Sequence, residues 1–183
     1  MEDNRLENTY KSKNWLVRTY FCYKINQAIQ LARLKKSDVI LDFGCGGGWL
    51  EQKLKNFNIY GYDTNPQKTF IKDYRTIKPT KIFALDVFEH IPKTELQKII
   101  ESFKKLNNQF EIIVSIPTEN FPSRKVRKLV GKEEIPKEHV TKYKDILELL
   151  QKNFTFKQKA NIFTVTHTFV FEHPKTDYVT SIK

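Results

Sequence analysis

The sequence predicts an α/β fold in which a mostly parallel β-sheet carries helices on both faces and one antiparallel strand near the C-terminal edge. Short apolar segments alternate with segments of helical periodicity, which is the order of β-α-β units. The first strand-like segments are apolar on both faces, as in a sheet that helices cover completely. The last two strand-like segments are joined too tightly for a crossover, so that pair must be antiparallel.

The elements follow in a regular order along the chain. Helices are expected over four segments: 14–34, 49–56, 93–106 and 142–151. Strands are expected over six segments: 39–41, 58–62, 81–85, 110–116, 154–160 and 162–172. A tight turn around Asn161 should join the last two strands, and prolines and Gly131 make 117–140 irregular.

The length of 183 residues predicts one domain over 1–183. We expect an N-terminal helical cap over 1–36, a ligand-binding half over 37–116 and a substrate-side half over 117–183. Two cysteines, Cys22 and Cys45, are too few for a disulfide framework, which favours a reducing compartment. No apolar run approaches the ~20 residues of a membrane span, and the first residues lack an apolar signal core. We therefore expect a cytoplasmic protein.

The net charge of +11 suits binding to nucleic acid, anionic membranes or phosphorylated substrates. Ordinary solvated lysines are the favoured explanation, because only one segment forms a local basic cluster. One segment, 124–132, is basic without an intervening acid. Its basic residues are Arg124, Lys125, Arg127, Lys128 and Lys132.

Four of the 6 glycines lie in one turn between a predicted strand and a predicted helix: Gly44, Gly46, Gly47 and Gly48. Such a turn lets backbone N–H groups approach a ligand closely. It lacks the Gly-Lys-Ser/Thr ending of a P-loop, and neither G-x-G-x-x-G frame is complete. The pattern that fits is D-x-G-x-G-x-G, beginning at Asp42.

The segment VILDFGCGGGWL resembles the first motif of class I S-adenosylmethionine-dependent methyltransferases, which have a Rossmann-like fold. The resemblance implies S-adenosyl-L-methionine as cofactor and S-adenosyl-L-homocysteine as product. It implies that Gly44, Cys45 and Gly46 lie against the methionine part of the cofactor and that Asp42 helps to hold its amino group.

Asp63 ends the second predicted strand in YGYDTNP, about 20 residues beyond the first glycine of the turn. An acidic residue at this separation binds ribose hydroxyls in Rossmann-type sites, because a carboxylate accepts from two vicinal hydroxyls. The resemblance adds the neighbouring Thr64 to the cofactor site. A helix N-cap before Pro66 is the alternative role of Asp63.

The segment ALDVFEHIP is similar to the DVLEHI segment of many small-molecule methyltransferases, which faces both cofactor and substrate. This similarity places Asp86 and Val87 at the cofactor. The stretches 112–120 and 139–154 are also similar to that subgroup, so the resemblance covers about residues 36–172. The connection from Asp63 to Lys81 is short, so the third strand of the family should be very short or absent, and Asp73 is the only candidate for an adenine contact.

Methyl transfer depends mostly on alignment, and a base is needed where the acceptor holds its proton tightly. His90 is the candidate base because histidine titrates near neutral pH, and a cap or packing role is the alternative. Glu89 could orient cofactor or substrate, His139 is a second candidate base, and His167 should be structural. No metal ligands are expected.

The missing Pro-Pro-aromatic run argues against adenine-N6 methylation of DNA, and the cysteines are not placed for pyrimidine attack. We expect O-, N- or C-methylation of a small molecule, glycan or lipid precursor, with the basic segment 124–132 favouring an anionic group. An RNA methyltransferase or basic RNA-binding protein is one alternative. A catalytically silent cofactor-binding partner subunit is another, and the oligomeric state stays open.

Overall fold

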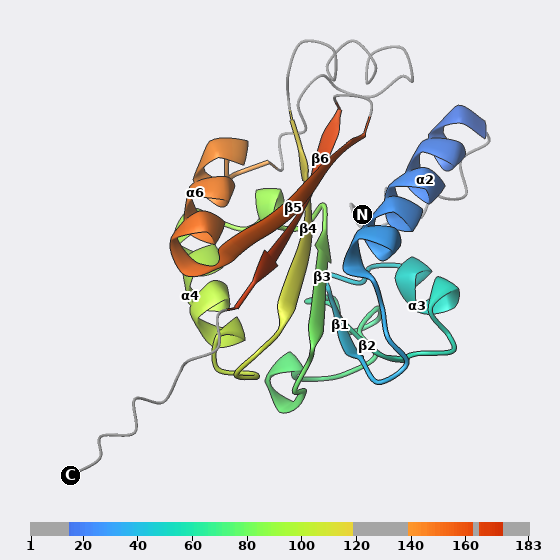
Figure 1. Cartoon of the computed structure of the whole chain (residues 1–183), viewed down its shortest axis with the longest axis horizontal. Coiled ribbons are helices and arrows are strands. Elements are labelled where there is room, and N and C mark those ends of the chain that lie inside the picture. The colour runs from blue at the N-terminus through green and yellow to red at the C-terminus, as the bar shows by residue number, and fades with distance from the viewer. Residues whose placement is uncertain (1–14, 119–138, 163–164, 174–183) are drawn as a thin grey trace.

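A computed structural model describes residues 15–118, 139–162 and 165–173 of the chain. Within them, one six-stranded sheet lies between two layers of helices (Figure 1). Its strand order is β2-β1-β3-β4-β6-β5. The strands are β1 (Val39–Phe43), β2 (Asn58–Tyr62), β3 (Lys81–Leu85), β4 (Glu111–Pro117), β5 (Thr155–Ile162) and β6 (Thr166–Glu172). The helices are α2 (Trp15–Ala32), α3 (Trp49–Lys53), α4 (Lys93–Phe103) and α6 (Tyr143–Asn153), with single 3₁₀ turns η1 (Tyr74–Thr76) and η2 (Phe88–His90).

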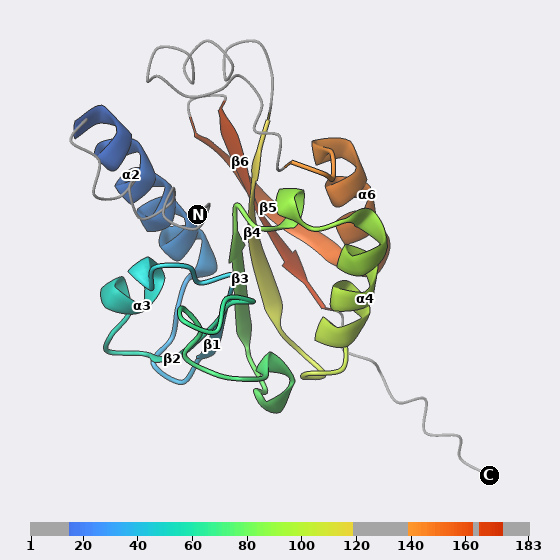
Figure 2. The same cartoon turned by 180° about the vertical axis from the view of Figure 1, so that it is seen from behind.

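The central strands are buried on both faces because their successive side chains enter two separate cores. Leu41 and Ile112 face α4 and α6, whereas Ile40 and Ile113 face α2 and α3. The view from behind shows the two helical layers on opposite sides of the sheet (Figure 2). The predicted α/β class with helices on both faces is therefore confirmed.

Strands β1 to β4 pair in parallel, and β6 pairs antiparallel with both β4 and β5. The predicted antiparallel pair is thus present, but the predicted turn around Asn161 is wrong. Asn161 lies inside β5 opposite His167, and the strand continues to Ile162. Ile162 is fully buried, so the apolar residue that follows outweighs the preference of asparagine for a turn.

The connection between β2 and β3 contains no strand, as its length predicts, and holds only η1 among residues that are all described. β2 is therefore an edge strand. The chain after β2 folds back, so that the backbone N–H groups of Phe70 and Ile71 both donate to the Gly61 carbonyl. The ring of Phe70 lies against this glycine and against Gly48.

Helix α2 packs on the sheet over β4, β5 and β6. Its apolar residues Ile25, Ala28 and Ala32 are buried, at the spacing that predicts a helix here. Among the residues that the structure describes, no helix combines the length and the apolar character needed to cross a membrane. The division of the domain at 36 and 116 stays a prediction, and the basic segment 124–132 lies outside the described residues.

Candidate active site

The glycine turn follows β1 directly and has the backbone conformation that favours glycine. Gly44, Gly46 and Gly48 have φ angles of 81°, 51° and 69°. The N–H groups of Gly44 and Cys45 donate to the Tyr62 carbonyl at 2.7 and 3.0 Å, which ties the turn to the end of β2. The glycines are not equivalent, because a Cβ on Gly44 would lie 2.5 Å from a Val87 methyl group whereas one on Gly46 would meet nothing within 4 Å. The turn therefore packs on its Gly44 side and opens at Gly46.

Asp63 lies immediately beside this opening. Its Oδ2 accepts the Gly46 N–H at 3.0 Å, and its Oδ1 accepts the Asn65 N–H at 2.9 Å. The predicted cap role is wrong, since no helix begins here and the carboxylate instead closes a local turn at Asn65. The structure thus brings together two predicted cofactor residues, Gly46 and Asp63. Thr64, next along the chain, is exposed.

A pair of buried carboxyl groups lies behind the turn. Asp42, only 5% exposed, faces Glu51 of α3, whose side-chain oxygens are also buried. Burial raises the pKa of Asp42 well above its ordinary value, and the negative charges of Glu51 and Asp63 raise it further. Burial also raises the pKa of Glu51. Ionisation of both carboxyl groups at once is therefore disfavoured. Sequence reasoning missed Glu51 as a site residue.

Gly61 makes room for this arrangement. A Cβ at this position would lie 2.2 Å from Oε1 of Glu51 and 3.0 Å from Sγ of Cys45. Cys45 is buried, and burial raises the pKa of its thiol strongly, so the thiol stays neutral. The Sγ–H donates weakly to the Lys68 carbonyl at 3.6 Å. Cys45 thus lines the turn as a small apolar group and is no nucleophile.

The side chain of Asp86, directly after β3, connects the sheet to helix α2. Its carboxylate forms an ion pair with Lys24 of α2 and accepts a hydrogen bond from the Ser115 hydroxyl at 2.6 Å. Asp86 has a φ of 56°, and Lys24 is 2% exposed and lies over the Phe21 ring. The contact joins α2, β3 and β4. Sequence reasoning missed Lys24, although a lysine on the apolar face of a helix was a visible signal.

Glu89, His90 and His139 form a third cluster, after the end of β3. The side chain of Glu89 is 3% exposed, and its Oε1 lies 4.0 Å from Nε2 of His90, which is 38% exposed. The His90 and His139 rings meet edge to face with centroids 5.0 Å apart. The predicted base His90, the second candidate base His139 and Glu89, for which an orienting role is expected, therefore lie together, although His90 and His139 are 49 positions apart in sequence.

Two other predicted candidates have structural partners. His167 shares a 2.7 Å hydrogen bond between its Nδ1 and the Tyr143 hydroxyl, which agrees with the structural role expected of it. Asp73 caps η1 and pairs with Arg75, and these hydrogen bonds lower the pKa of its carboxyl group. An adenine contact by Asp73 stays a prediction.

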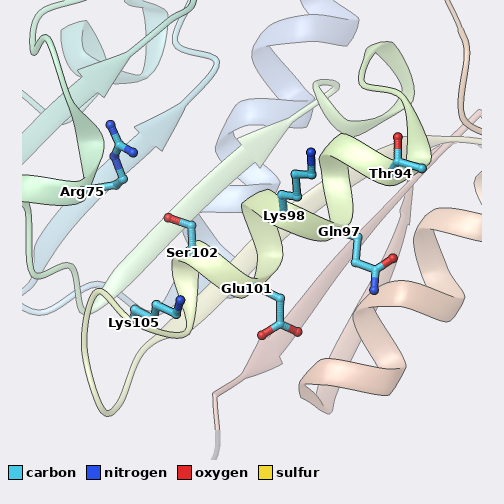
Figure 3. A pocket seen from close by; sticks show the side chains of 7 residues that line it. All are labelled: Arg75, Thr94, Gln97, Lys98, Glu101, Ser102 and Lys105. Carbon is cyan, nitrogen blue, oxygen red and sulfur yellow. The ribbon is translucent and has the colours of Figure 1, made fainter.

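A hollow of about 730 Å³ lies away from these clusters, against the outer surface of α4 (Figure 3). Its lining is polar and mostly charged: Arg75, Thr94, Gln97, Lys98, Glu101, Ser102 and Lys105. Its lining includes no residue of the glycine turn or of the Glu89–His90–His139 cluster.

Comparison with known proteins agrees with this arrangement. Residues 17–156 match the family described as a methyltransferase domain. A search of curated proteins by sequence gave no match. Solved structures that the chain resembles include magnesium protoporphyrin IX methyltransferase from Synechocystis PCC 6803 with bound S-adenosylhomocysteine. That likeness has 18% identity and a TM-score of 0.64, and it covers 93% of this chain and 94% of that one.

Two further structures are similar in fold. A SAM-dependent methyltransferase from Aquifex aeolicus is 12% identical, with a TM-score of 0.65 over 82% of this chain and 89% of that one. The small RNA methyltransferase HEN1 is 16% identical, with a TM-score of 0.62 over 85% of this chain and 25% of that one. The predictions of a methyltransferase with a Rossmann-like fold and S-adenosylmethionine as its cofactor are confirmed at the level of the family. The chain belongs to the methyltransferase-domain family and has the fold of class I S-adenosylmethionine-dependent methyltransferases.

Proposed function

We propose that the protein transfers a methyl group from S-adenosylmethionine to a hydroxyl oxygen of a small molecule, glycan or lipid precursor. One observation carries this proposal. The open side of Gly46 and the Asp63 carboxylate lie beside each other at the carboxyl edge of the sheet, and the Glu89–His90 pair follows the next strand of that edge. Ligands of open α/β sheets bind at this edge.

The residues around the turn fit the cofactor. Gly46 leaves its backbone uncovered where a side chain would block a ligand, and the Asp63 oxygens, which accept the N–H groups of Gly46 and Asn65, keep further lone pairs for ribose hydroxyls. Asp42 and Glu51 lie behind the turn as two buried carboxyl groups. Cys45, Thr64, Asp86 and Val87 complete the proposed lining. The bound cofactor supplies a methyl group on a positively charged sulfur.

His90 is proposed to receive the proton of the acceptor hydroxyl. Its imidazole is partly exposed, so a substrate can reach it, and the buried Glu89 carboxylate 4.0 Å away stabilises the imidazolium that forms. The acceptor oxygen would give this proton to His90 as it takes up the methyl group that the bound cofactor would supply. A hydroxyl acceptor needs such a base, whereas a neutral amine does not.

Titration calorimetry with S-adenosylhomocysteine tests the cofactor. We expect binding of this product and none of NAD, and the reverse result would contradict the proposal. Turnover is then sought in cell extract with S-adenosylmethionine labelled in the methyl group. Once a substrate is found, His90→Asn should lower kcat and remove the acidic limb of the pH profile, while the S-adenosylhomocysteine affinity stays unchanged.

The basic segment 124–132 is proposed to attract an anionic group of the substrate, because five basic residues raise the local anion concentration. Replacing Arg124, Lys125, Arg127 and Lys128 together by Gln should raise KM and abolish its salt dependence. An unchanged KM and an unchanged salt response would make this segment solvated surface.

An RNA substrate is the second candidate, favoured by the net charge of +11 and by the likeness to the small RNA methyltransferase HEN1. Phosphate contacts would make binding to a short RNA fall steeply with salt. A catalytically silent partner subunit is the third candidate, and S-adenosylhomocysteine binding without any turnover would support it.

A further inference from the structure

We propose that Glu89, His90 and His139 form a binding site for one divalent transition-metal ion, such as Mn²⁺, Co²⁺ or Zn²⁺. Each residue offers one ligand atom, and these three atoms all lie within 4.8 Å of one another. Metal–ligand bonds of about 2.0–2.2 Å place neighbouring ligand atoms about 2.8–3.6 Å apart at octahedral or tetrahedral angles. Side-chain rotations that close the longest separation by on the order of 1 Å would therefore complete the site.

The backbone holds the two halves of the cluster together. The N–H groups of Val140 and Thr141 donate to the Glu89 carbonyl at 2.8 and 3.2 Å, and the Thr141 hydroxyl donates to the Ile91 carbonyl at 2.6 Å. These bonds fix the residue after His139 against the turn that carries Glu89 and His90. The three side chains are thus brought together by contacts that do not depend on the ion, and little chain ordering is needed for binding.

The chemistry of the donors indicates the class of ion. Two imidazole nitrogens and one carboxylate oxygen suit Mn²⁺, Fe²⁺, Co²⁺ or Zn²⁺, whereas Mg²⁺ prefers an all-oxygen shell. The buried Glu89 carboxylate supplies negative charge at a site shielded from water, and the more exposed His90 lies on the solvent side. Three protein ligands leave coordination positions open for water or a substrate oxygen.

The site bears on the proposed methyl transfer, and this part rests on the proposed function. An acceptor oxygen bound at an open position would lose its proton to water more easily, because the cation stabilises the oxyanion. With an ion bound, His90 would be its ligand and water would take the proton, whereas without an ion His90 keeps the role of base proposed above. The acceptor would be a substrate whose hydroxyl or neighbouring oxygens bind such ions.

Ion binding can be measured without cofactor or substrate. Untagged protein freed of metal with a chelator is titrated with Co²⁺ and followed by visible absorption, and equilibrium dialysis against Mn²⁺ gives the stoichiometry. We expect one ion per chain and at least a tenfold weaker affinity in His139→Gln, since even loss of an outer partner weakens metal sites 10–100-fold. Mg²⁺ should compete poorly.

His167→Gln is the matched control, because His167 is bonded to Tyr143 outside the cluster and its loss should leave the affinity unchanged. His139→Gln changes a half-buried side chain, and circular dichroism checks its fold. No ion retained at millimolar concentration, or equal affinity in wild type and His139→Gln, would overturn the site and leave Glu89 and His90 as a proton-transfer pair. Failure of S-adenosylhomocysteine to bind would contradict the proposed function and leave the ion site standing.

Discussion

Replacing Asp63 by alanine should lower both the stability of the free protein and its affinity for the cofactor, and the two effects can be measured separately. In the free protein the change deletes the hydrogen bonds that the carboxylate accepts from the backbone of Gly46 and Asn65. At about 0.5–1.5 kcal/mol each, their loss should lower the free energy of unfolding by about 1–3 kcal/mol. In the complex it would also remove the proposed acceptor for the ribose hydroxyls. A hydrogen bond to a charged group contributes about 1.5–3 kcal/mol, which corresponds to an S-adenosylhomocysteine Kd about 10- to 150-fold higher.

Urea unfolding followed by circular dichroism gives the first quantity, and calorimetry under conditions where the variant is fully folded gives the second. Glu101→Ala is the matched control, because Glu101 is an exposed carboxylate that pairs with Lys104 at the end of α4, away from the turn. It should leave the Kd unchanged. A Kd within twofold of wild type in folded Asp63→Ala would refute the ribose role and make Asp63 only the support of the turn.

Three further substitutions test the rest of the site. Gly46→Val should abolish S-adenosylhomocysteine binding in a folded protein, because its side chain fills the open side of the turn at a φ of 51°, whereas Gly47→Ala in the same turn should bind normally. Lys24→Met should lower the free energy of unfolding in urea by about 1–3 kcal/mol, because the Asp86 carboxylate, which is only 20% exposed, loses its cation, and adding Asp86→Asn should recover part of this loss. Asp42→Asn should flatten the pH dependence of stability. Burial raises the pKa of Asp42 in the folded protein above its pKa in the unfolded chain. The contribution of Asp42 to the free energy of unfolding is therefore complete at pH values below the pKa of the unfolded chain. As the pH rises further, this contribution falls by about 1.4 kcal/mol per pH unit until the pH exceeds the pKa in the folded protein. Equal unfolding curves of wild type and Asp42→Asn from acid to neutral pH would contradict this reasoning.

Periodicity and turn chemistry were sufficient to predict the order of the strands and helices. Both signals are local, since a buried strand or a helix face repeats within a few residues. The exact element ends were less predictable, because they depend on packing. Helix α4 ends at Phe103 and not at residue 106, and β5 runs through Asn161 because Ile162 is buried behind it.

The residues of the glycine turn were predictable for the same reason. Positive φ at Gly44, Gly46 and Gly48 is a local requirement that only glycine meets without strain, and it therefore leaves a direct trace in the sequence. Asp63 could be predicted because parallel strands bring their carboxyl ends to one edge. Its distance in sequence from the turn reflects the length of one strand–helix–strand unit.

The partners of these residues could not be predicted, because their contacts depend on how distant elements pack. Lys24 and Asp86 are 62 residues apart, and only the placement of α2 over the sheet decides that the lysine reaches β3 and not solvent. His139 shares no sequence pattern with His90 and meets it through the backbone bond between Val140 and Glu89. In this chain, the glycine turn and Asp63 could thus be recognised from sequence as the proposed cofactor side of the sheet's carboxyl edge. The charged groups that would activate an acceptor are brought together only by tertiary contacts. For that reason the glycine turn was sufficient to predict the reaction class, and the nature of the acceptor depends on what the Glu89–His90–His139 cluster binds.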